Sequence, residues 1–140
     1  MDGKIKGPGA LETTNVGTFG VAKTTLLDKR FTMAYAAGIS DDNEVYFHDD
    51  RAGSPQVHPC IAFSLQWAAR FRPDQSQDPR VASFGVHAST DLVVHRPFKS
   101  GEAITTQGQL LQMRQISPGV YNVDLYRMTS STGELVAELY

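Results

Sequence analysis

The chain has 140 residues, of which 41% are hydrophobic and 20% charged, so it fits one globular domain with a sizeable core. Its formal net charge is −2 and its basic residues are scattered, which gives no electrostatic reason to expect nucleic acid or an anionic membrane as a partner. No apolar run approaches the roughly 20 residues of a membrane helix and the N-terminus lacks a signal-peptide core, so we expect a cytoplasmic protein.

The first third of the chain predicts a tail, a strand and a helix. Residues 1–16 are rich in glycine and poor in large apolar side chains, so we predict a flexible tail before one domain over residues 17–140. TFGVAKTTLL is typical of a strand. DKRFTMAYAAG predicts a helix, with Asp28 as its N-cap and Gly38 as the left-handed residue that ends it. The acidic stretch ISDDNEVYFHDD therefore begins where a helix ends.

The segment HPCIAFSLQWAARFR predicts a second, buried helix. Proline suits its first turn, and apolar side chains occur on nearly every face. Such a helix is expected to lie along a sheet that wraps it, and residues 72–80 then form a polar surface connection. We expect Ile61, Leu65, Ala68 and Ala69 to form one packed stripe, and Phe63 and Trp67 to fill another side.

The second half of the chain predicts an antiparallel meander. Four segments, residues 84–98, 102–116, 119–130 and 133–140, are rich in β-branched and aromatic residues and are separated by turn sequences. Within the third segment, Tyr121, Val123 and Leu125 alternate with Asn122, Asp124 and Tyr126, which predicts one buried face. The whole pattern predicts an α+β fold, with an antiparallel sheet wrapped around one long central helix.

Two motifs in this order resemble those of a known family. YAAGISDDNEVYFHDD resembles the segment Gly-Asp-x-Asn-Pro-x-His, and VHPCIAFSLQW resembles the Val-His-Gly-Met segment of the MaoC-like (R)-specific enoyl-CoA hydratases and 3-hydroxyacyl thioester dehydratases. TDLVVHRPFKSGEAITTQGQLL is similar to a strand pair of the same family. The resemblance runs from about residue 17 to the C-terminus. It implies a single hot-dog domain and an acyl thioester substrate, with coenzyme A or phosphopantetheine as part of the substrate and no separate cofactor.

The resemblance carries over residue by residue, with departures at the places that matter for catalysis. Asp41 falls on the catalytic aspartate and Asn43 on its asparagine, but Tyr46 holds the position of the catalytic histidine. Pro59 stands where active members have a glycine whose N–H polarises the thioester carbonyl. A phenol with a pKa near 10 is a poor general base, and proline has no N–H to donate. Asp41 is therefore a catalytic residue or the remnant of one.

Two histidines are candidates to replace the missing imidazole. His48 shares the face of Tyr46 only if the segment is extended, and it points away if the segment is a helical turn. His58 precedes the buried helix and is either near the pocket mouth or a packing histidine. His87 and His95 fit strand positions, and no histidine pair has the i, i+4 spacing of a zinc site, so we predict no metal.

Several candidate site residues also have a purely structural explanation. Asp41 and Asp42 also suit a capping role in the turn. The single cysteine, Cys60, excludes an internal disulfide and is either a reactive thiol near a helix start or a small buried one. Arg96 and Lys99 either contact the phosphates of coenzyme A or a carrier arm, or are solvated surface charges.

The departures resemble the non-catalytic halves of two-part MaoC-like dehydratases, which are N-terminal domains or accessory subunits. The leading hypothesis is an accessory, acyl-thioester-binding unit whose hydratase activity needs a catalytic partner. The alternatives are an autonomous homodimeric hydratase that uses Asp41 with His48 or His58, and a hot-dog thioesterase. An exposed sheet edge and helix flank favour pairing with a second hot-dog unit, as a homodimer or as a heterodimer with a catalytic MaoC-like partner.

Overall fold

A computed structural model describes residues 16–48, 55–70, 86–117 and 119–140. Residues 1–15 of the predicted tail and the predicted connection 72–80 lie outside this part. In chain order the elements are β1 (Lys23–Leu26), α1 (Lys29–Gly38), the 3₁₀ helix η2 (Glu44–Tyr46), α2 (Ile61–Ala68), β2 (Leu92–Val94), β3 (Ala103–Ile116), β4 (Gly119–Ser130) and β5 (Leu135–Leu139).

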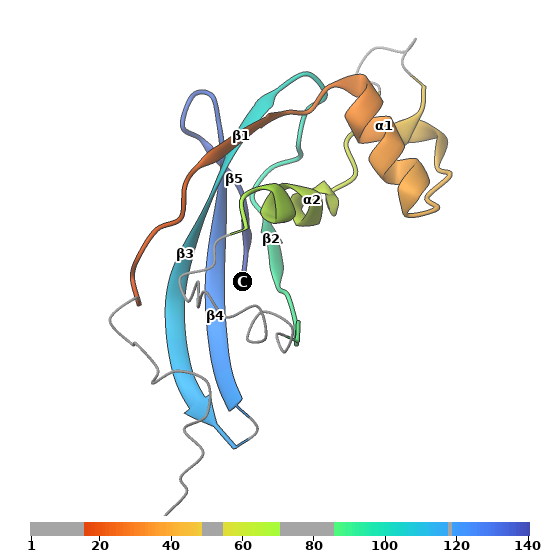
Figure 1. Cartoon of the computed structure of the whole chain (residues 1–140). Helices are drawn as coiled ribbons and strands as arrows, with labels where there is room; N and C mark the ends of the chain where they lie inside the picture. Colours follow the sequence, from red (N-terminus) through yellow and green to blue (C-terminus); the bar gives the residue numbers. More distant parts are fainter. Residues whose placement is uncertain (1–15, 49–54, 71–85, 118) are drawn as a thin grey trace, which may run out of the picture.

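The strands form one antiparallel sheet in the order β1-β3-β4-β5-β2. The hairpin of β3 and β4 is its longest part, and a bulge shifts its register between Leu110 and Gln112. The sheet curves around α2, and α1 lies beyond the end of the sheet (Figure 1). The predicted α+β arrangement, an antiparallel sheet around a central helix, is therefore confirmed.

The core lies between α2 and the inner face of the sheet. Ile61 and Leu65 of α2 pack in one cluster with Met128 of β4 and Leu139 of β5, and all four side chains are almost completely buried. Tyr126 also belongs to this cluster, opposite Gly108 of β3. Burial of these side chains is the main force that holds the helix against the sheet.

The predicted buried face of β4 was wrong, because Tyr126 and Met128 face the core cluster and Leu125 does not. Tyr126 was assigned to the more polar face, but it is 2% exposed and packs in the core. Leu125 is equally buried, on the opposite face of the sheet. The glycine opposite Tyr126 has no side chain, which leaves room for the ring on the inner face. Both faces of the sheet are thus covered at this point.

Helix α1 begins as predicted and ends two residues later. Asp28 is the N-cap, and its Oδ1 accepts a hydrogen bond from the N–H of Phe31 at 2.8 Å. The prediction that Gly38 takes the left-handed conformation was wrong, because Ser40 takes it, with a φ of 59°. The N–H of Ser40 donates to Ala37 O and that of Asp41 to Ala36 O, each at 3.0 Å. This is a Schellman ending, and it fixes the backbone of Asp41 to the end of α1.

Helix α2 is shorter and more one-sided than predicted. It has eight residues, and Ile61, Leu65 and Ala69 lie on its buried side as expected. Ala68 is exposed, and the side chain of Trp67 is 67% exposed with the Arg70 guanidinium 4.6 Å from its ring centroid. The predicted burial of these two residues was wrong, because the described sheet covers only one side of α2.

Candidate functional site

The structure brings together Asp41, which follows α1, and His58, which precedes α2. The Nε2 atom of His58 lies 3.4 Å from Oδ2 of Asp41, and both side chains are mostly buried, at 15% and 31% exposure. The predicted replacement of the missing imidazole by His58 thus has a geometric basis. His48 instead lies 3.2 Å from Glu44, its neighbour across one turn.

The hydrogen bonds of His58 define where its ring proton sits. Nδ1 accepts a hydrogen bond from the backbone N–H of Cys60 at 3.1 Å. A ring nitrogen that accepts a hydrogen bond carries no proton, so the neutral ring holds its proton on Nε2. That proton faces the carboxylate of Asp41. Both ring nitrogens are therefore engaged within the chain.

The carboxylate of Asp41 also organises the turn that follows it. Its Oδ1 accepts a hydrogen bond from the N–H of Asn43 at 3.1 Å. Asn43 in turn is the N-cap of η2, because its Oδ1 accepts from the N–H of Val45 at 3.2 Å. Asp41 thus has the capping role expected of an aspartate at this position and also faces the imidazole.

Two tyrosines flank the imidazole. The ring of Tyr46 lies 5.2 Å from that of His58, and the ring of Tyr35 lies 6.2 Å away. The hydroxyl of Tyr35 donates a hydrogen bond to the carbonyl of Cys60 at 2.5 Å, which ties α1 to the start of α2. Tyr35 was absent from the sequence-based candidates, since only the fold shows that its helix position faces α2.

Both phenols remain protonated in this environment. Burial raises the pKa of Tyr46 above its ordinary value, and the nearby charges of Asp41 and Cys60 raise it further. Burial also raises the pKa of Tyr35, followed by the effect of Cys60. A neutral phenol donates a hydrogen bond but does not take a proton from water near neutral pH. Tyr46 therefore does not act as a general base near neutral pH.

The start of α2 has no N–H left for a ligand. Pro59 has none by its chemistry, and the next four N–H groups donate within the chain. The N–H of Cys60 donates to Nδ1 of His58 at 3.1 Å, and that of Ile61 donates to the carbonyl of His58 at 3.0 Å. The N–H of Ala62 donates to the carbonyl of Pro59 at 3.3 Å, and that of Phe63 donates to the carbonyl of Cys60 at 3.0 Å. The N–H groups of residues 60–63 are thus all used within the chain.

Cys60 lies at the same junction, and its thiol is partly buried. It is the N-cap residue of α2, but its side chain makes no capping hydrogen bond. Its backbone carries the contacts, through its N–H to His58 and its carbonyl to Tyr35. Cys60 therefore serves this junction through its main chain.

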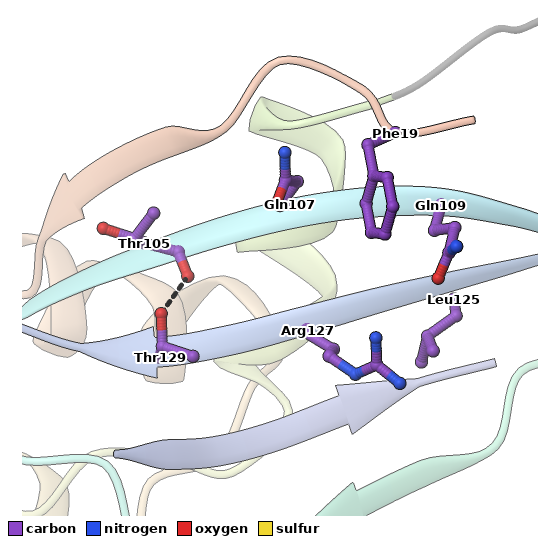
Figure 2. Close-up of a pocket in the computed structure, with 7 residues that line it drawn as sticks. All are labelled: Phe19, Thr105, Gln107, Gln109, Leu125, Arg127 and Thr129. Carbon is purple, nitrogen blue, oxygen red and sulfur yellow. Dashed lines mark hydrogen bonds between the residues drawn. The ribbon is translucent and has the colours of Figure 1, made fainter. Parts of the chain in front are cut away.

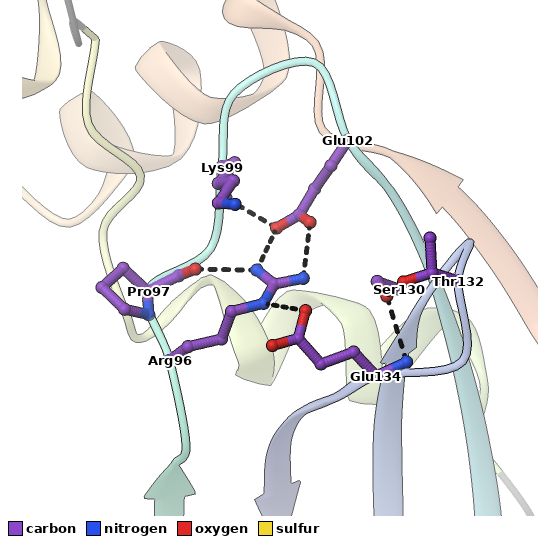
Figure 3. Close-up of polar contacts among 7 residues, drawn as sticks. All are labelled: Arg96, Pro97, Lys99, Glu102, Ser130, Thr132 and Glu134. Carbon is purple, nitrogen blue, oxygen red and sulfur yellow. Dashed lines mark hydrogen bonds and ion pairs between the residues drawn. The ribbon is translucent and has the colours of Figure 1, made fainter.

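The predicted phosphate ligands lie elsewhere. Arg96 is held by Glu102, whose carboxylate accepts from Nη1 at 3.1 Å and from Nη2 at 2.9 Å, and by Glu134, which accepts from Nε at 2.8 Å (Figure 3). These hydrogen bonds, those of Glu102 above all, raise the pKa of Arg96. Lys99 contributes its backbone N–H to Glu102 at 2.6 Å, while its residue is exposed. The guanidinium thus ties the loop before β3 to the turn before β5.

A separate cavity of about 180 Å³ lies on the face of the sheet away from α2. The side chain of Phe19 projects over it, and Leu125 forms part of its floor (Figure 2). The predicted site residues do not line it. Its lining consists of Phe19, Thr105, Gln107, Gln109, Leu125, Arg127 and Thr129.

Within residues 16–48, 55–70, 86–117 and 119–140, no group of three or more His, Cys, Asp or Glu side chains has a geometry that could hold a metal ion. None of the helices in those ranges is both long and apolar enough to span a membrane.

Comparison with known proteins finds similarity at the level of the fold. No family model matches the chain, and the search of curated proteins gives no match. The HadBC (3R-hydroxyacyl-ACP dehydratase) complex from Mycobacterium tuberculosis matches with a TM-score of 0.71 and 17% identity, over 93% of this chain and 96% of that one. The R-hydratase PhaJ1 from Pseudomonas aeruginosa has a TM-score of 0.67 and 19% identity, over 89% and 77%.

A MaoC-like dehydratase from Phytophthora capsici matches with a TM-score of 0.70 and 18% identity. The match covers 86% of this chain but only 43% of that one, so the similar unit is less than half of a longer protein. At identities of 17–19%, these matches support a conclusion about the fold alone. The chain has the hot-dog fold of these hydratases and dehydratases.

Proposed function

We propose that this chain is an acyl-thioester-binding hot-dog unit of a MaoC-like enoyl hydratase or 3-hydroxyacyl dehydratase, and that it does not catalyse the reaction by itself. The substrate class is an acyl chain on coenzyme A or on a carrier protein. The catalytic aspartate, histidine and oxyanion donor come from a partner hot-dog subunit or domain. In this assembly, Asp41, Tyr46 and His58 form part of the wall of the acyl pocket.

The observation that carries this proposal is the state of the helix start at residues 59–63. Hydration of an enoyl thioester builds negative charge on the carbonyl oxygen, and loss of one donor to that oxygen typically costs about 10²- to 10³-fold in rate. Here proline removes one N–H, and internal acceptors take the next four. The chain therefore lacks a stabilising group for the transition state even though it keeps a carboxylate.

The imidazole of His58 does not offset this loss. Its Nδ1 lone pair is used by the N–H of Cys60, and its Nε2 proton faces Asp41. To act as a base, the ring would have to give up the hydrogen bond that holds the start of α2. The pair is better suited to holding two elements together than to transferring a proton.

The compared proteins support the need for a partner. The HadBC structure is a complex, and the Phytophthora protein is more than twice as long as the region it shares with this chain. A hot-dog unit that lacks its own oxyanion donor fits the accessory role in such a pair.

Binding and turnover of the purified chain test the proposal. We expect saturable binding of an acyl-CoA by calorimetry, together with no hydration of a trans-2-enoyl-CoA above the uncatalysed rate. Tyr46→Trp adds bulk beside His58 in the wall of the proposed acyl pocket. It should weaken acyl-CoA binding about tenfold, since overpacking typically costs about 1–3 kcal/mol. Tyr121→Trp makes the same change on β4 and should leave the affinity unchanged. Absence of acyl-CoA binding would disprove the proposed role.

A second candidate function is an autonomous hydratase that uses Asp41 and His58. The 3.4 Å contact between these side chains favours it over the version with His48, whose imidazole pairs with Glu44. It requires turnover by the chain alone that both Asp41→Ala and His58→Ala abolish. His48→Ala is the matched control and should retain full activity.

A further inference from the structure

The cavity on the outer face of the sheet is built on a row of paired side chains. Leu125, Arg127 and Thr129 of β4 line it, and each lies opposite a lining residue of β3. Alternate residues of a strand point to the same face, so the whole row faces away from α2. Leu125 is 2% exposed and gives the cavity an apolar floor, while the other side chains of the row are polar or charged.

Residues 17–20, with the sequence GTFG, extend along β3 and form the roof of the cavity. The N–H of Gly17 donates to the carbonyl of Leu110, and that of Gly20 donates to the carbonyl of Gly108, each at 2.8 Å. The backbone of this segment is therefore attached to β3 at both of its ends.

Two glutamines of the cavity wall hold the same segment from below. The side-chain amide of Gln109 donates to the carbonyl of Gly17 at 3.2 Å, and that of Gln107 donates to the carbonyl of Gly20 at 3.0 Å. Between these two points, the ring of Phe19 projects over the cavity and is 58% exposed (Figure 2). An aromatic ring is thus held in place over the apolar floor.

The guanidinium of Arg127 is the charged group of the cavity wall. Its Nε donates to Oε1 of Glu138 at 3.2 Å, and its side chain makes no other hydrogen bond or ion pair within the part of the chain that the structure describes. A guanidinium has five N–H donors, and its Nη1 and Nη2 groups form a fork that matches a carboxylate. Arg127 therefore keeps donors for a second anionic group.

Arg96 shows that one guanidinium of this chain holds two carboxylates. Its Nε donates to Glu134, and its Nη1 and Nη2 donate to the two oxygens of Glu102. Arg127 makes the first kind of contact, with Glu138, and it lines a cavity. The charge of Glu138 is thus compatible with a second carboxylate on the same guanidinium.

We propose that this cavity binds a small aromatic carboxylate, of which benzoate is the simplest example. The carboxylate accepts hydrogen bonds from Nη1 and Nη2 of Arg127, and the ring packs between Phe19 and Leu125. Pockets for drug-sized ligands measure about 300–1,000 Å³. The volume of about 180 Å³ therefore suits a molecule with a single ring.

This site goes beyond the proposed function and does not depend on it. It lies on the face of the sheet away from α2, and Asp41, Tyr46 and His58 do not line it. A chain that binds benzoate but no acyl-CoA would disprove the proposed function and leave this site standing. A chain that binds acyl-CoA but no benzoate would do the reverse.

Titration of the full chain with sodium benzoate, followed by amide NMR at constant ionic strength, tests the site. We expect saturable shifts in residues 17–20 and in the side-chain amides of Gln107 and Gln109, with a Kd on the order of 1 mM, as suits so small a ligand. Benzamide has the same ring without the charge and should bind about tenfold more weakly or less. Absence of saturable shifts, or equal affinities for benzoate and benzamide, would overturn the proposal.

Substitution of the guanidinium tests the proposed carboxylate contact. Arg127→Lys keeps the positive charge but lacks the planar fork, so it should weaken benzoate binding about tenfold. Arg114→Lys is the matched control, because Arg114 also belongs to the β3–β4 hairpin but lies over the ring of Tyr121 and does not line the cavity. It should leave the affinity unchanged. Equal Kd values for the two variants would disprove the role of Arg127.

Substitution of the roof tests the contact with the ring. Phe19→Leu keeps an apolar side chain but removes the aromatic face, so it should weaken the binding of benzoate and change that of cyclohexanecarboxylate much less. Phe19 is largely exposed, so we expect the variant to fold, with an amide spectrum that is unchanged outside the cavity. If Phe19→Leu binds benzoate as tightly as the wild type does, the ring does not lie under Phe19 and the proposed site is wrong.

Discussion

The imidazole of His58 joins the end of α1 to the start of α2, because Nε2 faces the carboxylate of Asp41 at 3.4 Å and Nδ1 accepts from the N–H of Cys60 at 3.1 Å. The hydroxyl of Tyr35 makes a third link between the same elements. The ionisable groups at this junction are therefore used to hold the chain together.

Removal of this imidazole should lower stability. His58→Ala leaves the N–H of Cys60 and one oxygen of Asp41 without their partner in a partly buried site, which costs about 1–2 kcal/mol in the free energy of unfolding. Urea denaturation measures this change. His48→Ala removes a more exposed pair, that with Glu44, and should change stability less, by about 0.5 kcal/mol. Equal effects of the two variants would show that the contacts of His58 with Asp41 and Cys60 do not contribute to stability.

The sequence predicted Asp41 and His58 as candidate residues of this junction, but it predicted neither Tyr35 nor the contacts among them. The motif spacing identified Asp41 and His58 separately, and local patterns even predicted the N-cap at Asp28. Whether His58 or His48 lies near the carboxylate depends on where α2 sits relative to α1, a long-range relationship. The 3₁₀ turn at Glu44–Tyr46 directs His48 back to Glu44, and only the folded chain shows this.

The tyrosines at the junction should make stability fall at high pH. Their pKa values are raised above 10 in the folded state, so the unfolded chain loses these protons first. The contribution of the two protonated tyrosines to the free energy of unfolding is therefore fully present below about pH 10. It decreases as the pH rises through their pKa values in the folded state. Tyr35→Phe and Tyr46→Phe should each reduce this decrease. Denaturation midpoints measured between pH 8 and pH 11 provide the test, and an identical pH profile for wild type and both variants would contradict it.

The ion pairs of Arg96 with Glu102 and Glu134 should stabilise the folded chain. Arg96→Lys cannot keep both carboxylates, because an ammonium lacks the planar fork of the guanidinium. Since Arg96 and Glu102 are 16% and 15% exposed, we expect a loss of about 1–2 kcal/mol in thermal or urea unfolding. Lys99→Ala keeps the backbone N–H that bonds Glu102 and should be nearly neutral. If Arg96 instead binds phosphate, Arg96→Lys will weaken acyl-CoA binding without lowering stability.

The missing catalytic groups suggest a gain-of-function variant. Tyr46→His with Pro59→Gly returns an imidazole and an N–H to the positions where the resemblance requires them. General acid–base assistance and one oxyanion donor are each typically worth at least about 10²-fold, so the double variant should hydrate enoyl-CoA at least about 10²-fold faster than the parent chain. The added change Asp41→Ala should remove the gain. A gain that survives this change would show that it does not arise at the site.

The strands could be predicted better from the sequence than the burial of individual side chains. Period and turn chemistry predicted β3, β4 and β5 because β-branched alternation is a local signal. In the predicted segment 84–98, the described strand is only Leu92–Val94. The same local signal did not reveal that Trp67 is exposed or that Tyr126 is buried. Those outcomes depend on which side of α2 the sheet covers and on the glycine opposite Tyr126, which are tertiary facts.

Hydration of a trans-2-enoyl thioester by the purified chain, measured beside acyl-CoA binding on the same preparation, distinguishes an accessory unit from an autonomous hydratase. For an accessory unit we expect saturable binding with no turnover above the uncatalysed rate, and turnover only when a catalytic hot-dog partner is added. Turnover by the chain alone that is lost in both Asp41→Ala and His58→Ala would show instead that the chain is a hydratase by itself.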